Sequence, residues 1–513
     1  MDKKFYVTTA IPYVNAAPHI GFAQEVVETD AIARYHRLMG EDVFFLTGTD
    51  ENAQKNVQAA EKAGVPVTTF VDQNAQLFYK LKKLLNLSFN DFIRTTEKRH
   101  FAGAQKLWRN FKKSDVYKKK YRGLYCVGCE AFYEPEDLVG GFCPEHPKDK
   151  LEIIEEGNYF FRLSRYEKWL KSLIERDELE IVPGIRKNET LAFIERGLKD
   201  FSISRPSKRT KGWGVPVPGD PAQVMYVWVD ALSNYITALD YADNGPLFRK
   251  YWPADLHVIG KGVNRFHSIY WPAMLQSAHL PIPKEIFVHG YITVEGQKMS
   301  KSLGNVISPF EVVEKYGTDA VRYYLLREIP PYHDGDFSYS RFEQLYNADL
   351  ANGLGNLLAR VLALVEKNCG HQVPQIDLNP DSHPLRANQK IYNWKKSWQD
   401  IDKLLPQYRF NEALESIWKF ISEADRYIDE NRPWELAKKD KKKFNWVIYG
   451  LLDSLHQVAW QIYPFLPETS LEIADRLGIN KLLAVNPLNK DSWTNLKPGT
   501  KITFKKPLFP RIK

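Results

Sequence analysis

Two short segments, far apart in the chain, carry side chains suited to phosphate. His19 stands in PHIGF at residues 18–22, where a strand-like run ends and a helix is predicted to begin. Backbone N–H groups at a helix start, with an imidazole beside them, form an anion site. Lys298 and Lys301 belong to the second segment, KMSKS at residues 298–302, on a loop flanked by glycines. Two such ammonium groups can close over a triphosphate and neutralise charge as pyrophosphate leaves.

Each segment alone has a simpler interpretation. An isolated His19 would be a loop histidine with local hydrogen bonds, and a lone KxxK is usually a solvated basic turn. The pair, in this order on one chain, is far more specific than either half.

A second set of residues predicts a metal site. Three of only four cysteines fall within residues 126–143 and are followed by a histidine, in the pattern C-x2-C-x13-C-x2-H. Thiolates plus one imidazole at this spacing favour a tetrahedral, structural Zn²⁺ whose closed shell leaves no catalytic position. The alternative, two unrelated cysteine pairs, has a probability of roughly one in ten. The predicted ligands are Cys126, Cys129, Cys143 and His146.

Length and composition indicate a folded protein of several domains. A chain of 513 residues exceeds one hydrophobic core, and 44% hydrophobic with 26% charged residues argues against long disordered tracts. The net charge of +8 suits a polyanionic partner but is weak support for one. Without a signal peptide or an 18-residue apolar run, we expect a cytoplasmic protein that does not enter a membrane.

The predicted secondary structure changes along the chain, from alternating strands and helices to helices alone. The first ninety residues alternate β-branched runs with amphipathic helical patterns, which predicts a parallel sheet covered by helices. A cysteine-rich and glycine-rich stretch then interrupts this rhythm, which returns at VMYVWVDAL, DLHVIGKG and EIFVHGYITV. Beyond residue 346 the pattern is helical almost throughout.

We therefore predict an α/β fold. A Rossmann-like parallel-sheet domain, split by a zinc-bearing insertion, is followed by a helical bundle. The predicted boundaries are 1–117 and 225–290 for the two halves of the sheet domain, 118–224 for the insertion, 291–345 for a linking segment with KMSKS, 346–480 for the bundle, and 481–513 for a tail that packs back on the body.

PHIGF and KMSKS resemble the HIGH and KMSKS signatures of class I aminoacyl-tRNA synthetases. The runs TTAIPYVNAAPHIG, FLTGTDE, YVWVDALSNYI, VIGKG, FHSIYWPAML and VHGYITVEGQKMSKSLGN are similar to the methionyl-tRNA synthetase family through residues 5–304. The single four-ligand zinc pattern resembles a bacterial-type branch of that family. The resemblance implies methionine–tRNA ligase activity, with ATP, L-methionine and tRNA(Met) as substrates and Mg²⁺ accompanying ATP.

The resemblance also implies site residues. His19, Lys298 and Lys301 would be catalytic. The ATP site would include these three with Gly21, Phe22, Gly260, Lys261, His289, Met299 and Ser300. The methionine site would include Ile11, Tyr13, Asp50, Trp228, Ala231, Tyr235, Val263 and His267. Aromatic rings and a histidine suit a polarizable thioether through dispersion contacts. Taken singly, Trp228 and Tyr235 are more simply core residues.

In the helical half, Asn352, Asn356 and Arg360 recur at i, i+4 and i+8, so they share a stripe of one helix. These groups can read the edges of unstacked bases, and Trp434 offers a stacking face. The simpler alternative is that the asparagines satisfy a helix end. Because the four match anticodon-reading positions of the family, we expect them to bind the CAU anticodon. The lysine-rich KKDKKK at residues 438–443 is most simply a solvated face.

Three positions depart from the family pattern. Phe22 replaces the last histidine of HIGH, the family's DEHG is DENA with Asn52, and its GKD is GKG with Gly262. We expect all three substitutions to lie around the nucleotide, where they would reduce the rate of the reaction and leave the fold unchanged. Two alternatives stay open: a catalytically weakened tRNA-binding paralogue, and a class I synthetase for leucine, isoleucine, valine or cysteine. A monomer is expected because the chain stops soon after the helical half.

Overall fold

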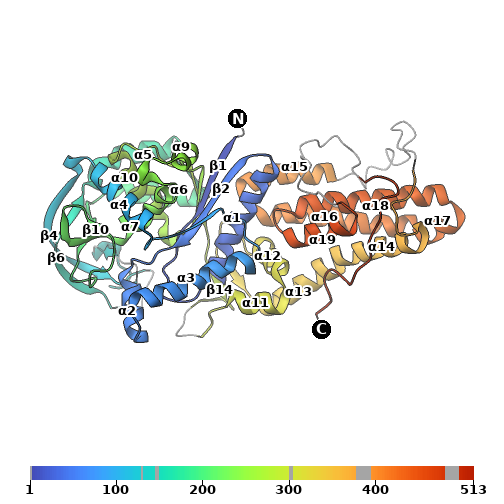
Figure 1. The fold of residues 1–513 in the computed structure, drawn as a ribbon, viewed down its shortest axis with the longest axis horizontal. Helices are drawn as coiled ribbons and strands as arrows, with labels where there is room; N and C mark the ends of the chain where they lie inside the picture. Colours follow the sequence, from blue (N-terminus) through green and yellow to red (C-terminus); the bar gives the residue numbers. More distant parts are fainter. Residues whose placement is uncertain are drawn as a thin grey trace.

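The computed structural model describes residues 3–128, 131–133, 135–144, 150–299, 304–376, 394–479 and 496–512. The molecule is elongated, with the sheet-containing half at one end and long helices at the other (Figure 1).

A six-stranded parallel sheet forms the centre of the first half, in the order β3-β2-β1-β12-β13-β7. The order runs outward in one direction from β1 and in the other from β12, so the topology switches between these two strands. The strands are β1 Lys4–Thr9, β2 Asp42–Thr49, β3 Asp91–Arg94, β7 Glu180–Val182, β12 Leu256–Gly260 and β13 Glu285–His289.

Alternation of side chains along each strand builds a core on both faces of this sheet. Tyr6 belongs to one apolar cluster and its neighbour Val7 to the other, and Val258 and Ile259 divide in the same way. Because both faces are buried, the strands read as continuous apolar runs. This is the parallel α/β architecture predicted from the sequence, and the two predicted halves do join in one sheet.

Helices surround the sheet. Those of the first half are α1 Ile20–Leu38, α2 Gln54–Ala63, α3 Val67–Leu84, α4 Lys98–Asn110, α5 Glu167–Glu175, α6 Gly184–Glu195, α7 Val227–Leu232, α8 Asn234–Thr237, α9 Pro246–Tyr251 and α10 Trp271–Ser277. A π-helix at Phe266–Tyr270 leads directly into α10.

The middle of the chain forms two small antiparallel sheets, ordered β5-β4-β6-β8 and β10-β11-β9. Their strands are β4 Val116–Cys126, β5 Ala131–Tyr133, β6 Glu152–Phe161, β8 Phe201–Ser202, β9 Ser204–Pro206, β10 Pro216–Val217 and β11 Asp220–Met225. The stretch 118–224 also supplies β7, which pairs with β13 at the edge of the main sheet. The expected insertion is therefore interwoven with the catalytic core.

A three-stranded sheet, β15-β14-β16, connects the two halves. It consists of β14 Ile292–Val294, β15 Gln297–Lys298 and β16 Gly335–Phe337, with α11 Pro309–Tyr316 and α12 Thr318–Arg327 between its last two strands. The backbone of the KMSKS loop begins in β15.

The helical half contains α13 Tyr339–Leu345, a π-helix at Tyr346–Gly355, α14 Asn356–Cys369, α15 Trp394–Leu404, α16 Phe410–Asn431, α17 Pro433–Lys439, α18 Lys441–Ile462 and α19 Pro467–Arg476. The continuous helix Tyr339–Cys369 is long and apolar enough to cross a membrane by length and composition alone. Within the protein it buries Leu354, Leu358 and Val361 in the core, as a helix of a bundle does.

The end of the chain lies against this bundle. Thr500 and Ile502 exchange backbone hydrogen bonds with residues that follow α14, and the Asn347 side chain bonds both backbone groups of Ile512. These contacts hold residues 500, 502 and 512 against the helical half.

Candidate active site

A cavity of about 770 Å³ lies at the carboxyl ends of β1, β2, β12 and β13 in the sheet-containing half. These strands flank the point where the sheet order reverses, which is where open α/β sheets bind ligands. The start of α1 and the segment around Gly128 and Pro144 complete the wall. The fold thus brings residues from four distant parts of the chain to one site.

His19 is the N-cap of α1. Its Nδ1 accepts a hydrogen bond from the backbone N–H of Gly21 at 3.1 Å. Nδ1 therefore carries no proton, so the neutral ring holds its proton on Nε2. Desolvation lowers the pKa of His19, which favours this neutral form. The ring lines the cavity and offers an N–H donor at the positive end of the α1 dipole.

The two signature segments meet at Gly21. A Cβ at that position would lie 3.0 Å from His19 Cε1 and 3.5 Å from Met299 Cε, the methionine of KMSKS. Behind this contact, the Ile20 N–H donates to the carbonyl of Ile307 at 3.0 Å. The loop therefore reaches the start of α1. Lys298 has a described backbone, in β15, whereas Ser300 and Lys301 lie outside the described residues.

Two of the three departures lie in this cavity. Phe22 and Gly262 line its wall, and the Phe22 ring meets Phe78 of α3 edge to face, with centroids 5.2 Å apart. Phe22 thus stabilises the wall by apolar packing where a histidine would offer a hydrogen bond. Beside Gly262, the Lys261 ammonium pairs with Asp334 at 2.7 Å.

The third departure is elsewhere, so the expectation that Asn52 surrounds the nucleotide is wrong. Asn52 is buried outside the cavity lining, and its Nδ2 donates to Asp230 at 2.8 Å and to the Thr95 carbonyl at 3.0 Å. Asp230 also pairs with the buried His100, at 2.5 Å. An amide in this network satisfies a buried carboxylate, so its role is structural.

His289 lines the cavity as a cation. Its Nδ1 donates to the Gly290 carbonyl at 2.7 Å, and its Nε2 pairs with Glu25 at 2.9 Å. Burial alone would lower the pKa of His289, but the bond to Glu25 and the nearby carboxylate of Glu28 raise it to about 9. Burial also raises the pKa of Glu28 to about 7. Gly260 lies beside this pair, where a Cβ would come within 3.6 Å of His289 Cε1.

Five of the eight expected methionine residues line the cavity: Ile11, Tyr13, Asp50, Trp228 and Val263. The Trp228 ring stacks on Phe266, with centroids 3.7 Å apart and planes within 5°, and meets Tyr13 edge to face at 6.5 Å. Asp50 forms an isolated bridge with Tyr13, just beyond the ends of β2 and β1. An aromatic wall and a carboxylate therefore face the same space.

The other three, Ala231, Tyr235 and His267, do not line the cavity and lie buried behind it. His267 Nδ1 donates to the Val263 carbonyl at 2.9 Å, so its Nε2 accepts the Tyr235 hydroxyl proton at 2.7 Å. Burial lowers the pKa of His267 to about 4, so the ring is neutral at physiological pH. These residues support the wall that Val263 presents.

The cysteine-rich segment forms the rim of the same cavity. Cys126 ends β4, and both Cys126 and Cys143 are fully buried in one apolar cluster. Between the first two predicted ligands, the Gly128 carbonyl accepts from Lys55 at 3.1 Å, which ties this segment to α2. Cys129 and His146 lie outside the described residues.

The predicted anticodon residues lie on the helical half. Asn352 and Asn356 belong to the continuous helix, so the simpler interpretation as a helix end does not apply. Asn352 falls in the π-helix, where Trp418 Nε1 donates to the Asp349 carbonyl at 3.0 Å. Arg360 pairs with Asp425 at 2.6 Å and with Asp429 at 2.5 Å.

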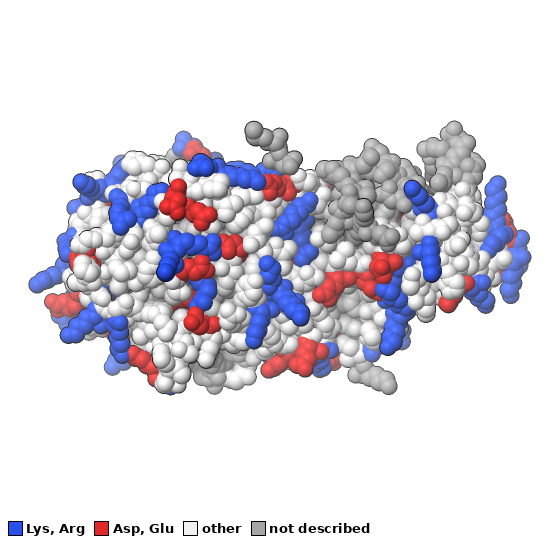
Figure 2. Space-filling view, in the orientation of Figure 1, with Lys and Arg blue, Asp and Glu red and all other residues white. Residues whose placement is uncertain are grey.

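Trp434 lies in the first turn of α17, and 46% of its surface is exposed. Lys and Arg side chains gather at this end of the molecule (Figure 2). Within KKDKKK, Asp440 caps α18 by accepting from the Lys443 N–H at 2.9 Å. The lysine-rich segment therefore joins two helices while most of its lysines face solvent.

Several residues that line the cavity were not predicted, among them Phe266 and Glu25. Phe266 was adjacent to the expected His267, and the structure stacks it on Trp228. Glu25 follows Phe22 by three residues on α1, a spacing that places both on one helix face and could have identified it.

Comparisons with known proteins identify the family. The family model described as "tRNA synthetases class I (M)" matches residues 5–362, and "Anticodon-binding domain of tRNA ligase" matches residues 393–506. The chain is 44% identical to the methionine–tRNA ligase of Thermotoga maritima, covering 99% of this chain and 80% of that protein. It is 42% identical to that of Brucella suis, covering 99% and 98%.

Solved structures give the same result. The Mycobacterium tuberculosis methionyl-tRNA synthetase in complex with methionyl-adenylate aligns with a TM-score of 0.92 and 41% identity, over 99% of this chain and 100% of that one. Identity above 40% along nearly the whole length exceeds what a shared fold alone would require, and it extends over both the sheet and the helical bundle. This chain therefore belongs to the methionyl-tRNA synthetase family.

Proposed function

We propose that the cavity at the switch point activates methionine with ATP, and that the helical half selects the tRNA which receives it. The chain is a methionine–tRNA ligase. The observation that carries the assignment of the site is the meeting of His19, Gly21 and Met299. Through this contact the helix N-terminus and the methionine of KMSKS line one cavity.

In the first step, a methionine carboxylate oxygen bonds to the α-phosphorus of ATP while the bond from that phosphorus to pyrophosphate breaks. No protein nucleophile is needed. The His19 Nε2–H and the positive end of the α1 dipole stabilise phosphate charge, and Lys298 and Lys301 meet the departing pyrophosphate. Mg²⁺ bound with ATP would neutralise part of the triphosphate charge.

The remaining expected ATP residues surround this space, with Gly260 and His289 at the ends of adjacent strands. The protonated His289, held by Glu25 of α1, adds a positively charged donor to this wall. Ser300 completes the KMSKS loop.

Methionine would lie against Tyr13 and Trp228, with Asp50 holding its ammonium group and Ile11 contributing backbone. The Tyr235–His267 pair fixes the wall at Val263, and Ala231 packs behind it. In the second step, a terminal hydroxyl of the tRNA, the 2′ hydroxyl as in other class I enzymes, attacks the adenylate carbonyl carbon and releases AMP.

A structural Zn²⁺ would be held by Cys126, Cys129, Cys143 and His146. The burial of both described thiols and the soft donor set support it. The ion would cross-link the rim of the cavity and would not take part in either bond-making step.

For tRNA(Met), we propose that Asn352, Asn356, Arg360 and Trp434 contact the CAU anticodon. Trp434 supports this role best because its ring is exposed. Arg360 would have to exchange at least one of its carboxylate partners for a base. We further propose a cytoplasmic monomer that does not enter a membrane.

The test is ATP–pyrophosphate exchange with methionine, leucine, isoleucine, valine and cysteine in turn. Methionine alone should support it. A histidine at position 22 would donate one hydrogen bond to a charged phosphate, worth about 1.5 to 3 kcal/mol, which Phe22 cannot make. Phe22→His should therefore raise the catalytic efficiency of exchange by about tenfold to a hundredfold. His19→Ala is the control and should nearly abolish exchange. A natural protein inactive with every amino acid, but active as Phe22→His, would identify a silenced paralogue.

A further inference from the structure

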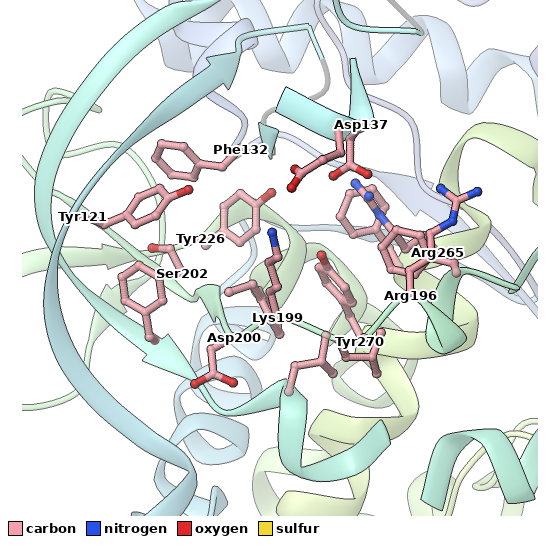
Figure 3. Close-up of a pocket in the computed structure, with 18 of the residues that line it drawn as sticks. Tyr121, Phe132, Asp137, Arg196, Lys199, Asp200, Ser202, Tyr226, Arg265 and Tyr270 are labelled. Carbon is pink, nitrogen blue, oxygen red and sulfur yellow. The ribbon is translucent and has the colours of Figure 1, made fainter. Parts of the chain in front are cut away.

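A second cavity, of about 400 Å³, lies within the inserted part of the chain and adjoins the active site. Asp137, Phe193, Arg265 and Phe266 line both cavities, so the two share a wall. Figure 3 shows aromatic rings on one side of the second cavity and the side chains of Arg196 and Arg265 on the other. Its volume falls in the range of about 300 to 1,000 Å³ that is typical of small-molecule sites.

The aromatic side is suited to a flat ring. Tyr121 of β4 and Phe132 of β5 meet edge to face, with centroids 5.0 Å apart, and Tyr226 stands beside them at 4% exposure (Figure 3). Aromatic rings that line a cavity in this way can stack a nucleobase, as in single-stranded nucleic acid sites, where each stacked base contributes about 1 to 3 kcal/mol.

Arg205 supplies a buried guanidinium in the wall. The side chain is 4% exposed and lies over three rings, those of Tyr226 at 4.4 Å, Phe132 at 4.8 Å and Tyr125 at 5.3 Å. Its Nη1 donates to Ser202 Oγ. Its Nε and Nη2 have no hydrogen-bond partner in the part of the chain that the structure describes. Unsatisfied N–H groups on a buried cation call for acceptors from a ligand.

Arg265 stands where the two cavities meet. Its guanidinium lies 5.1 Å from the Phe193 ring and 5.5 Å from the Phe266 ring. Across the described residues, no carboxylate forms an ion pair with it. A cation held between rings at this junction is placed to bind a phosphate that passes from one cavity to the other.

We propose that this cavity binds one cytidine of the single-stranded CCA end of the tRNA while the terminal ribose enters the active site. The proposal rests on the proposed function, because the 3′ end must reach the adenylate next door. Cytosine presents two adjacent acceptors, O2 and N3, which match the two unsatisfied N–H groups of Arg205. Its amino group can donate to the Asp137 carboxylate. Uracil presents an N–H at N3, which would oppose the guanidinium.

Photocross-linking tests the location directly on the natural chain. A tRNA(Met) transcript carrying 5-iodocytidine at either of the two cytidines before the terminal adenosine is bound and irradiated, and the adduct is mapped by mass spectrometry. One of the two positions should cross-link to Tyr121, Phe132 or Tyr226. Adducts found only on residues outside this cavity would overturn the proposal.

A kinetic test addresses the recognition. In the natural protein, replacing the bound cytidine by uridine should raise the KM for tRNA about tenfold. Arg205→Lys keeps a cation among the rings but loses the planar fork. We expect it to raise the KM for normal tRNA about tenfold, to remove the preference for cytidine, and to leave pyrophosphate exchange unchanged.

Arg209→Lys is the matched control. Arg209 also lies over the Tyr125 ring, at 4.5 Å, but pairs with Glu156 at 2.6 Å and lines neither cavity. It should leave the cytidine preference intact. Equal preference for cytidine and uridine in the natural protein refutes the proposal, whether or not Arg205→Lys folds. A failure of methionine-dependent exchange would instead refute the proposed function.

Discussion

Glu28 makes the stability of the protein depend on pH in a way that can be calculated. Its carboxyl group is fully buried on α1, one turn beyond Glu25, and its Oε1 accepts from Gln24 Nε2 at 2.9 Å. Its Oε2 is buried with no hydrogen-bond partner among the described residues. Burial raises its pKa from 4.5 to about 7, although the cationic His289 opposes the shift.

The sign follows from proton uptake. Between pH 4.5 and pH 7 the folded protein keeps a proton on Glu28 that the unfolded chain has lost. The contribution of Glu28 to the free energy of unfolding is therefore fully present below pH 4.5, and it is lost as the pH rises through 7. At about 1.4 kcal/mol per pKa unit, a shift of about 2.5 units corresponds to roughly 3 kcal/mol.

Glu28→Gln should remove this loss, because the amide remains neutral and keeps an oxygen for Gln24. In urea unfolding followed from pH 4.5 to pH 8, the variant should gain up to about 3 kcal/mol on the natural protein as the pH rises. Other buried carboxyls titrate in both proteins, so they cancel in the difference. Glu175→Gln, at an exposed carboxylate of α5, is the control and should follow the natural protein. A constant difference between Glu28→Gln and the natural protein at all pH values would refute the reasoning.

Four further substitutions test separate parts of the proposal. Lys301→Ala should slow methionine activation more than a hundredfold with little change in methionine binding, and equal losses in both would contradict a role in the transition state. Trp434→Ala should weaken tRNA aminoacylation but spare pyrophosphate exchange, whereas a joint fall would indicate a structural role. Elemental analysis of the natural protein should find one zinc ion per chain, and Cys126→Ser should reduce this content. The variant should have a lower Tm while it still catalyses pyrophosphate exchange, and a natural protein without zinc would exclude the ion. Tyr235→Phe removes the donor to His267 Nε2, so it should lower the free energy of unfolding by about 1 to 3 kcal/mol and raise the KM for methionine. If neither value changed, the hydrogen bond would be dispensable.

The sheet was predictable because its physical cause is local. A strand buried on both faces must be apolar at consecutive positions, as at Val258 and Ile259, and the helices between strands carry their own period. The edge strand β7 has only three residues, and its partner β13 follows about a hundred residues later. No period can be detected in so short a segment, so its place in the main sheet was not predicted.

The candidate site likewise contains residues that local sequence could place and residues that only tertiary packing places. Residues next to the signature segments, such as His19 and Phe22, could be placed because each segment carries its own local geometry. The position of Asn52 could not, because its partner Asp230 is 178 residues away and both are buried. The assignment of Tyr235 and His267 to the wall behind the cavity likewise depends on tertiary packing, since their spacing along the chain indicates no shared face.

The junction between the two halves shows what long-range packing adds to function. Helix α1 begins at the wall of the larger cavity and buries Asp30 one to two turns beyond Glu25, where Asp30 pairs with Arg322 of α12 at 2.8 Å. The same guanidinium donates to the carbonyls of Pro464 and Phe465, between α18 and α19. A fully buried arginine with these partners has one low-energy arrangement, because any displacement leaves a charge or a carbonyl unsatisfied. The helix that presents His19 is therefore fixed to the helical half, so a tRNA bound there meets an active site at a defined distance and orientation.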